Sequence, residues 1–182
     1  MYEFIKKTYR GSLYGLTAVE ENIHFTIYVL ASFFVPFLLS HPQIVVGVVV
    51  NTALILGATY LKGYKMLPLI LLPSLGVLAA GLIFGPFTPL LLYMMPFIWL
   101  GNAAYAYGYK FMMQKKNNRL LCVAIPSLLK AALLFLPALV LVKIGVLPVL
   151  FLTAMGLIQL ATALIGGTAA SVIVEMRNRV TA

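Results

Sequence analysis

The stretch AIPSLLKAALLFLP, residues 124–137, carries one charged residue, Lys130, in an otherwise apolar setting. It lies within a longer apolar run, 120–142, which can cross a bilayer as a helix because a span needs about 20 residues. Lys130 stands 11 residues from Arg119 and 13 from Lys143, which is roughly 16 and 20 Å along a helix. The run therefore predicts a membrane-spanning helix with a positive charge near its middle, beyond easy reach of either surface.

The composition of the whole chain indicates a protein whose main solvent is lipid. Of its 182 residues, 63% are hydrophobic and 9% are charged, whereas soluble domains are about half apolar and about a quarter charged. A water-soluble fold of this length could not hide so much apolar surface. We therefore expect one integral membrane domain, residues 1–182, without a second soluble domain. The single cysteine, Cys122, excludes an internal disulfide.

Five further apolar runs resemble the first in length, and none alternates cleanly between apolar and polar residues, as a transmembrane barrel would require. The predicted fold is an all-α integral membrane bundle of six transmembrane helices. Its spans are expected at roughly 23–40, 43–61, 66–84, 88–109, 120–142 and 147–174. Residues 1–20, which begin MYEFIKKTYRGSLYG, are expected to form a short amphipathic segment at the membrane surface.

The basic residues predict the orientation of these spans, because cytoplasmic loops carry an excess of lysine and arginine. With the N-terminus inside, the cytoplasmic segments hold 11 basic residues: Lys6, Lys7, Arg10, Lys62, Lys65, Lys110, Lys115, Lys116, Arg119, Arg177 and Arg179. The outer loops hold only Lys143. Both termini are therefore expected in the cytoplasm, in a multi-pass protein of the cell membrane. The net charge of +9 then reflects topology and contact with the lipid bilayer, and needs no nucleic-acid partner.

The acidic residues exclude several classes of function. The chain contains no aspartate, and its four glutamates, Glu3, Glu20, Glu21 and Glu175, all lie near the predicted cytoplasmic face. No carboxylate is thus available at depth for a proton relay, and paired carboxylates for acid–base catalysis are missing. The two histidines stand at opposite ends of the first span, no cofactor motif is present, and no GxxxxGK[ST] loop grips a nucleoside triphosphate. These features argue against an enzyme, a metal site and a stand-alone ion-coupled transporter.

Four polar side chains fall well inside their spans: Asn51, Asn102, Lys130 and Gln159. Burying a lysine at mid-membrane costs about 2.5–3.5 kcal/mol on insertion scales, so Lys130 should face the bundle interior, a wet cavity or a partner. Ser127 shares its helical face, and Trp99 shares the face of Asn102.

From this pattern we predict a substrate-binding site lined by spans four to six. The residues expected in it are Lys130, Asn102, Gln159, Trp99, Asn51 and Ser127. Lys130 would hold an anionic or carbonyl group, the amides would donate or accept hydrogen bonds, and Trp99 would stack on a ring. The alternative is that the amides only bridge helices, each for about 1 kcal/mol.

Two stretches resemble a known family. LPSLGVLAAGLIFGPF, residues 72–87, is similar to the third helix and following loop of the substrate-binding (S) components of energy-coupling factor transporters. LIQLATALIGGTAASVIVEMRNR, residues 157–179, resembles their last helix. The resemblance implies binding of a vitamin or similar micronutrient from outside, with a separate transmembrane coupling subunit and ATPase subunits driving uptake.

The leading hypothesis is therefore a membrane-embedded substrate-binding component. Two others stay open. In a structural subunit of a larger membrane complex, Lys130 would pair with a carboxylate on another chain. A small independent facilitator would move its solute unaided.

Overall fold

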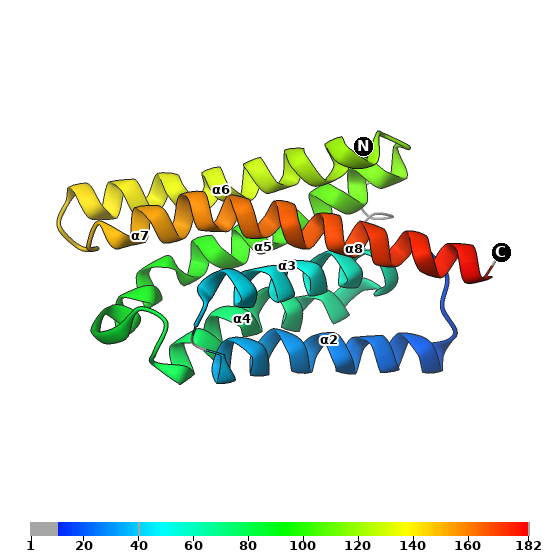
Figure 1. Cartoon of the computed structure of the whole chain (residues 1–182), viewed down its shortest axis with the longest axis horizontal. Coiled ribbons are helices and arrows are strands. Elements are labelled where there is room, and N and C mark those ends of the chain that lie inside the picture. Colours follow the sequence, from blue (N-terminus) through cyan, green and yellow to red (C-terminus); the bar gives the residue numbers. More distant parts are fainter. Residues whose placement is uncertain (1–10, 40, 182) are drawn as a thin grey trace.

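The computed structural model describes residues 11–39 and 41–181, and over these residues the chain is helical with no strand. Six of its helical segments are long and apolar enough to cross a membrane, which confirms the all-α prediction and indicates a multi-pass membrane protein. The elements (Figure 1) are α2 Ala18–Leu38, α3 Gln43–Tyr60, η1 Gly63–Lys65, α4 Met66–Ala80, η2 Gly85–Leu90, α5 Leu91–Gln114, α6 Arg119–Lys143, α7 Leu150–Thr153, η3 Ala154–Ile158 and α8 Gln159–Thr181.

The first span begins at Ala18, earlier than predicted, because Thr17 and Glu20 form a capping box. The Thr17 hydroxyl accepts from the Glu20 N–H, and the Glu20 carboxylate accepts from the Thr17 N–H at 2.9 Å. Residues 11–17, the described part of the expected 1–20 segment, are not helical. They pack on the end of α3, where the Leu13 N–H donates to the Thr59 carbonyl at 2.9 Å. Residues 1–10, with Glu3, Lys6, Lys7 and Arg10, lie outside the described residues.

The third and the last span also differ from their predictions. A glycine ends the third span early, and a π-helical turn interrupts the last one. The third span stops at Ala80, because Gly81 adopts a left-handed conformation with φ of 70° and ends the helix. The last span is not one α-helix, since η3 is a π-helical turn between α7 and α8. Such turns are rare and recur near functional sites.

The contacts between helices close into a ring, which Figure 1 shows from the side. Neighbouring pairs are α2 with α3, α3 with α8, α8 with α6, α6 with α5, α5 with α4 and α4 with α2, and α3 also contacts α4 and α5 across the ring. Small residues permit the closest approaches. A Cβ on Gly166 of α8 would lie 2.8 Å from the Val48 carbonyl oxygen of α3, and one on Gly76 of α4 would lie 2.6 Å from the Phe33 carbonyl oxygen of α2. Large apolar side chains such as Ile27, Leu136 and Val172 cover the outside of the ring, as lipid contact requires.

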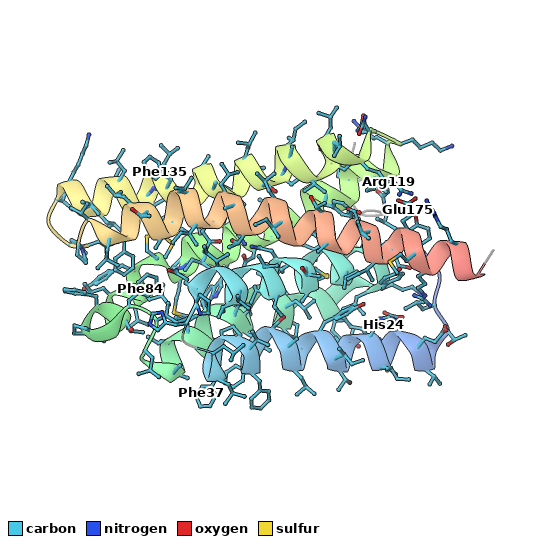
Figure 2. The ribbon with its side chains drawn as sticks, in the orientation of Figure 1. His24, Phe37, Phe84, Arg119, Phe135 and Glu175 are labelled. Atoms are coloured by element: carbon cyan, nitrogen blue, oxygen red, sulfur yellow. The ribbon has the colours of Figure 1, made fainter. Side chains whose placement is uncertain are left out.

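Charge is concentrated at one end of the bundle, where α2 begins and α8 ends. We call this the charged end; it comprises residues 17–22, 61–65, 110–119 and 175–179. Here Glu21 lies 3.3 Å from the Lys65 ammonium, and Arg119 lies 2.7 Å from Glu175 (Figure 2). Among the described residues, only Lys130 and Lys143 carry charge away from this end. Lys143 lies at the opposite end of the bundle, and Lys130 lies between the two ends.

Candidate functional site

A cavity occupies the half of the bundle toward the opposite end. The part nearest that end, which we call the mouth, is lined by Pro36 of α2, Gln43 of α3 and Phe84 of the loop before η2. Figure 2 shows Phe84 far from Arg119 and Glu175 along the bundle. The centres of water-sized molecules can occupy about 80 Å³ of this space, and a single water needs about 10–15 Å³ on that measure. The cavity can therefore hold a small molecule.

All six membrane-length segments line the cavity, whereas the sequence pattern predicted a site lined by spans four to six, with Asn51 as the one residue from span two. Spans two and three contribute because α3 and α4 turn their Asn51 and Ser74 faces inward. The lining residues are Pro36, Gln43, Val46, Gly47, Val50, Asn51, Pro73, Ser74, Val77, Ile83, Phe84, Leu91, Ile98, Asn102, Lys130, Met155, Ile158, Gln159 and Thr162.

The inner end of the cavity is formed by a hydrogen-bonded chain from three helices. The Lys130 ammonium of α6 donates to Asn51 Oδ1 of α3 at 2.6 Å, and Asn51 Nδ2 donates to Thr162 Oγ1 of α8 at 3.1 Å. The ammonium also lies 5.3 Å from the centre of the Tyr105 ring, a distance suited to a cation–π contact. Lys130 is 2% exposed. A buried lysine is thus held by one amide oxygen and one aromatic face, and no carboxylate among the described residues contacts it.

Asn102 reaches the cavity from α5. Its Nδ2 donates to the Ile70 carbonyl of α4 at 3.0 Å, about one turn before Pro73. Asn102 thereby ties α5 to α4. Among the described residues no donor reaches its Oδ1, so this acceptor is available to a bound molecule.

Gln159 reaches the cavity from the first residue of α8, directly after the π-helical turn. Its side-chain amide has no hydrogen-bond partner within the described part of the chain. Met155 and Ile158, within the turn, line the cavity beside it. The local widening of the helix therefore supplies both apolar wall and one uncommitted amide.

Two predicted site residues lie outside the lining. Trp99 Nε1 donates to Ser74 Oγ at 2.8 Å, so the indole contacts a lining residue without lining the cavity itself. Ser127 donates to the Val123 carbonyl of its own helix at 2.7 Å and is fully buried. The structure thus brings Lys130, Asn51, Asn102 and Gln159 to one cavity, and it leaves Trp99 and Ser127 beside that cavity.

Sequence reasoning missed three polar lining residues: Gln43, Ser74 and Thr162. Thr162 carried a usable signal, because it stands three positions after Gln159 and shares its helical face. Gln43 is the first residue of the predicted second span, and its position at the end of a span gave it no signal as a lining residue. Ser74 gave no signal of its own, since its importance comes from Trp99, which is distant in sequence.

The chemistry of the lining is that of a binding pocket. Its described residues include no carboxylate, thiol or imidazole, and the described residues include no group of three or more His, Cys, Asp or Glu that could hold a metal. Its chemistry consists of one ammonium, neutral amides and hydroxyls, and an apolar wall. Ligand pockets commonly have this character, with a few placed polar groups in an apolar surround.

Comparison with protein-family models, with curated proteins and with solved structures finds no match for this chain. The case for its function therefore rests on the cavity and on the distribution of charge.

Proposed function

We propose that this protein is a membrane-embedded component that binds a small molecule for uptake across the cell membrane. The observation that carries the proposal is the Lys130–Asn51 pair at the inner end of a cavity shared by all six spans. A buried charge costs free energy, and one that lacks an acidic partner is retained most readily where it has a function. Binding a ligand is the function that a cavity of this lining supports best.

The proposed orientation places the charged end in the cytoplasm, in agreement with the preference of basic loops for that side. The mouth of the cavity would then face outward, so that the protein would take its ligand from outside the cell. Both termini would be cytoplasmic.

The proposed energy source is a separate module with a transmembrane coupling subunit and ATPase subunits. The chain has no loop for a nucleoside triphosphate, and the glutamates that the structure describes stand clear of the cavity. The resemblance of residues 72–87 and 157–179 to S components of energy-coupling factor transporters supports the same arrangement, in which this chain binds the ligand and other subunits hydrolyse ATP. On this proposal the ligand is a vitamin or similar micronutrient.

Mass spectrometry of small molecules that survive gentle purification tests the proposal. The parent protein should retain a compound that Lys130→Met retains at least tenfold less, at equal protein recovery. Identical retention by both proteins, or none by either, would contradict a site at Lys130. Affinity purification from the native membrane gives a second test, because ATPase subunits should accompany the chain.

The two other hypotheses, a structural subunit and an independent facilitator, can be distinguished from the proposed binding component. A structural subunit whose Lys130 pairs with another chain requires that lysine on an outer surface, and its 2% exposure counts against this arrangement. An independent facilitator would move the retained compound into liposomes that contain this chain alone, whereas the proposed binding component would not.

A further inference from the structure

We propose that the ligand is a small monocarboxylate, bound with its carboxylate at Lys130 and its apolar body toward the mouth. This inference rests on the proposed function and concerns the same cavity. Three properties of the lining carry it: the number of charges, the balance of donors and acceptors, and the size of the space.

The lining carries one positive charge and no negative charge. The described glutamates, Glu20, Glu21 and Glu175, all lie at the charged end, and Glu21 and Glu175 are occupied there by lysine and arginine. A bound monoanion would neutralise the Lys130 ammonium, whereas a dianion would leave a net negative charge buried and a cation would be repelled. Charge alone therefore ranks monoanions above neutral compounds, and both above dianions and cations.

The free hydrogen-bonding groups favour a carboxylate. An ammonium has three donors, and Lys130 uses one of them on Asn51. Gln159, in the same lining, adds an uncommitted amide that can donate. An ionised carboxylate is an acceptor only, with two oxygens, and matches these donors. A phosphate monoester brings up to two negative charges, and the lining has one positive charge to meet them.

Most of the remaining lining is apolar and selects the body of the ligand. Val46, Val50, Ile98, Met155 and Ile158 present no hydrogen-bonding side chain. A body rich in hydroxyl groups would lose its bonds to water on entering and would find few replacements here. A hydrocarbon chain or a small ring would instead gain from leaving water.

The size of the cavity limits the length of that body. The 80 Å³ open to the centres of water-sized molecules is several times the about 10–15 Å³ that a single water requires on that measure. We infer a ligand larger than one water and no longer than a short chain or a small ring. A short-chain or small-ring acid satisfies this limit, and a long-chain fatty acid drawn from the membrane does not.

The test measures the affinity of a matched series by the fluorescence of Trp99, the single tryptophan of the chain, which contacts the lining residue Ser74. The probes are pentanoate, pentanamide, pentylamine, glutarate and hexadecanoate, with the protein in phosphatidylcholine nanodiscs. Equilibrium dialysis of labelled pentanoate checks the optical signal. We expect pentanoate to bind at least tenfold more tightly than every other probe. Lys130→Met should reduce that preference over pentanamide to less than threefold.

Equal or tighter binding of pentanamide, pentylamine or glutarate would overturn the inference about charge. Tighter binding of hexadecanoate would overturn the limit on size and identify a lipid-derived acid. Preference for pentanoate that persists in Lys130→Met would overturn the position of the carboxylate. If the parent retains a neutral or cationic compound through Lys130, the proposed function stands and this inference alone fails. If no compound is retained and no probe binds, both fail.

Discussion

The hydrogen bond between Lys130 and Asn51 should be the most consequential polar contact in the bundle. In Asn51→Leu the buried ammonium loses its amide acceptor, and Thr162 loses its donor. A hydrogen bond to a charged group contributes about 1.5–3 kcal/mol and a neutral one about 0.5–1.5 kcal/mol. We therefore expect the substitution to lower the free energy of unfolding by about 2–4 kcal/mol. At about 2–4 °C per kcal/mol for a chain of this length, thermal unfolding in a fixed detergent should shift down by roughly 4–16 °C.

The double variant supplies the decisive comparison. Lys130→Met removes the buried charge, and replacing buried charges by apolar groups of similar volume is often neutral or stabilising. Lys130→Met/Asn51→Leu should therefore unfold within about 1 kcal/mol of the parent, so that the effects of the single changes do not add.

The matched control is Asn22→Leu. Asn22 also accepts from a lysine, Lys65, at 2.8 Å, but it does so at the exposed charged end. Its loss should cost less than about 1 kcal/mol. Strict additivity of Asn51→Leu and Lys130→Met, or an Asn51→Leu effect no larger than that of Asn22→Leu, would refute the reasoning.

Two further predictions concern packing and orientation. Gly166→Ala should destabilise the bundle by about 1–3 kcal/mol, because its Cβ would meet backbone atoms of α3 at 2.8 and 3.0 Å. Gly108→Ala, whose Cβ would stand 3.4 Å from its nearest neighbours, should be neutral or stabilising in the same thermal assay. In a Cys122→Ser background, a membrane-impermeant maleimide on intact cells should label Phe87→Cys at the opposite end and spare Tyr64→Cys at the charged end. The reverse pattern would place the cavity mouth in the cytoplasm.

Much of the fold follows from composition and span length, because a bilayer requires about 20 apolar residues in each helix whatever their order. The approximate positions of the six spans could therefore be predicted. The position of Lys130 near the middle of its span could also be predicted, because the rise per residue of a helix converts a distance in sequence into a distance along the helix axis. The helix ends were less predictable, as the Thr17 capping box and the left-handed Gly81 depend on local geometry.

The candidate site was predictable only as a set of polar residues. Hydropathy indicates which side chains are out of place in lipid, but it does not give the rotation of each helix about its axis. That rotation decides that Asn102 enters the cavity while Trp99, three residues before it, turns to Ser74. The contribution of α3 and α4 depends on which helices are neighbours in the ring, and apolar runs of similar length do not encode this.

Filling the cavity tests the central claim most directly. Val50 lines the cavity and is 7% exposed, so Val50→Phe should occupy the space that the ligand needs while keeping Lys130 and its partners. Val140→Phe, at a position of α6 that is 58% exposed, controls for the added ring. Binding of the compound retained by the parent should be measured for all three proteins at equal thermal stability. We predict that Val140→Phe binds as the parent does and that Val50→Phe binds at least tenfold more weakly; equal binding by all three would contradict the assignment of this cavity as the site.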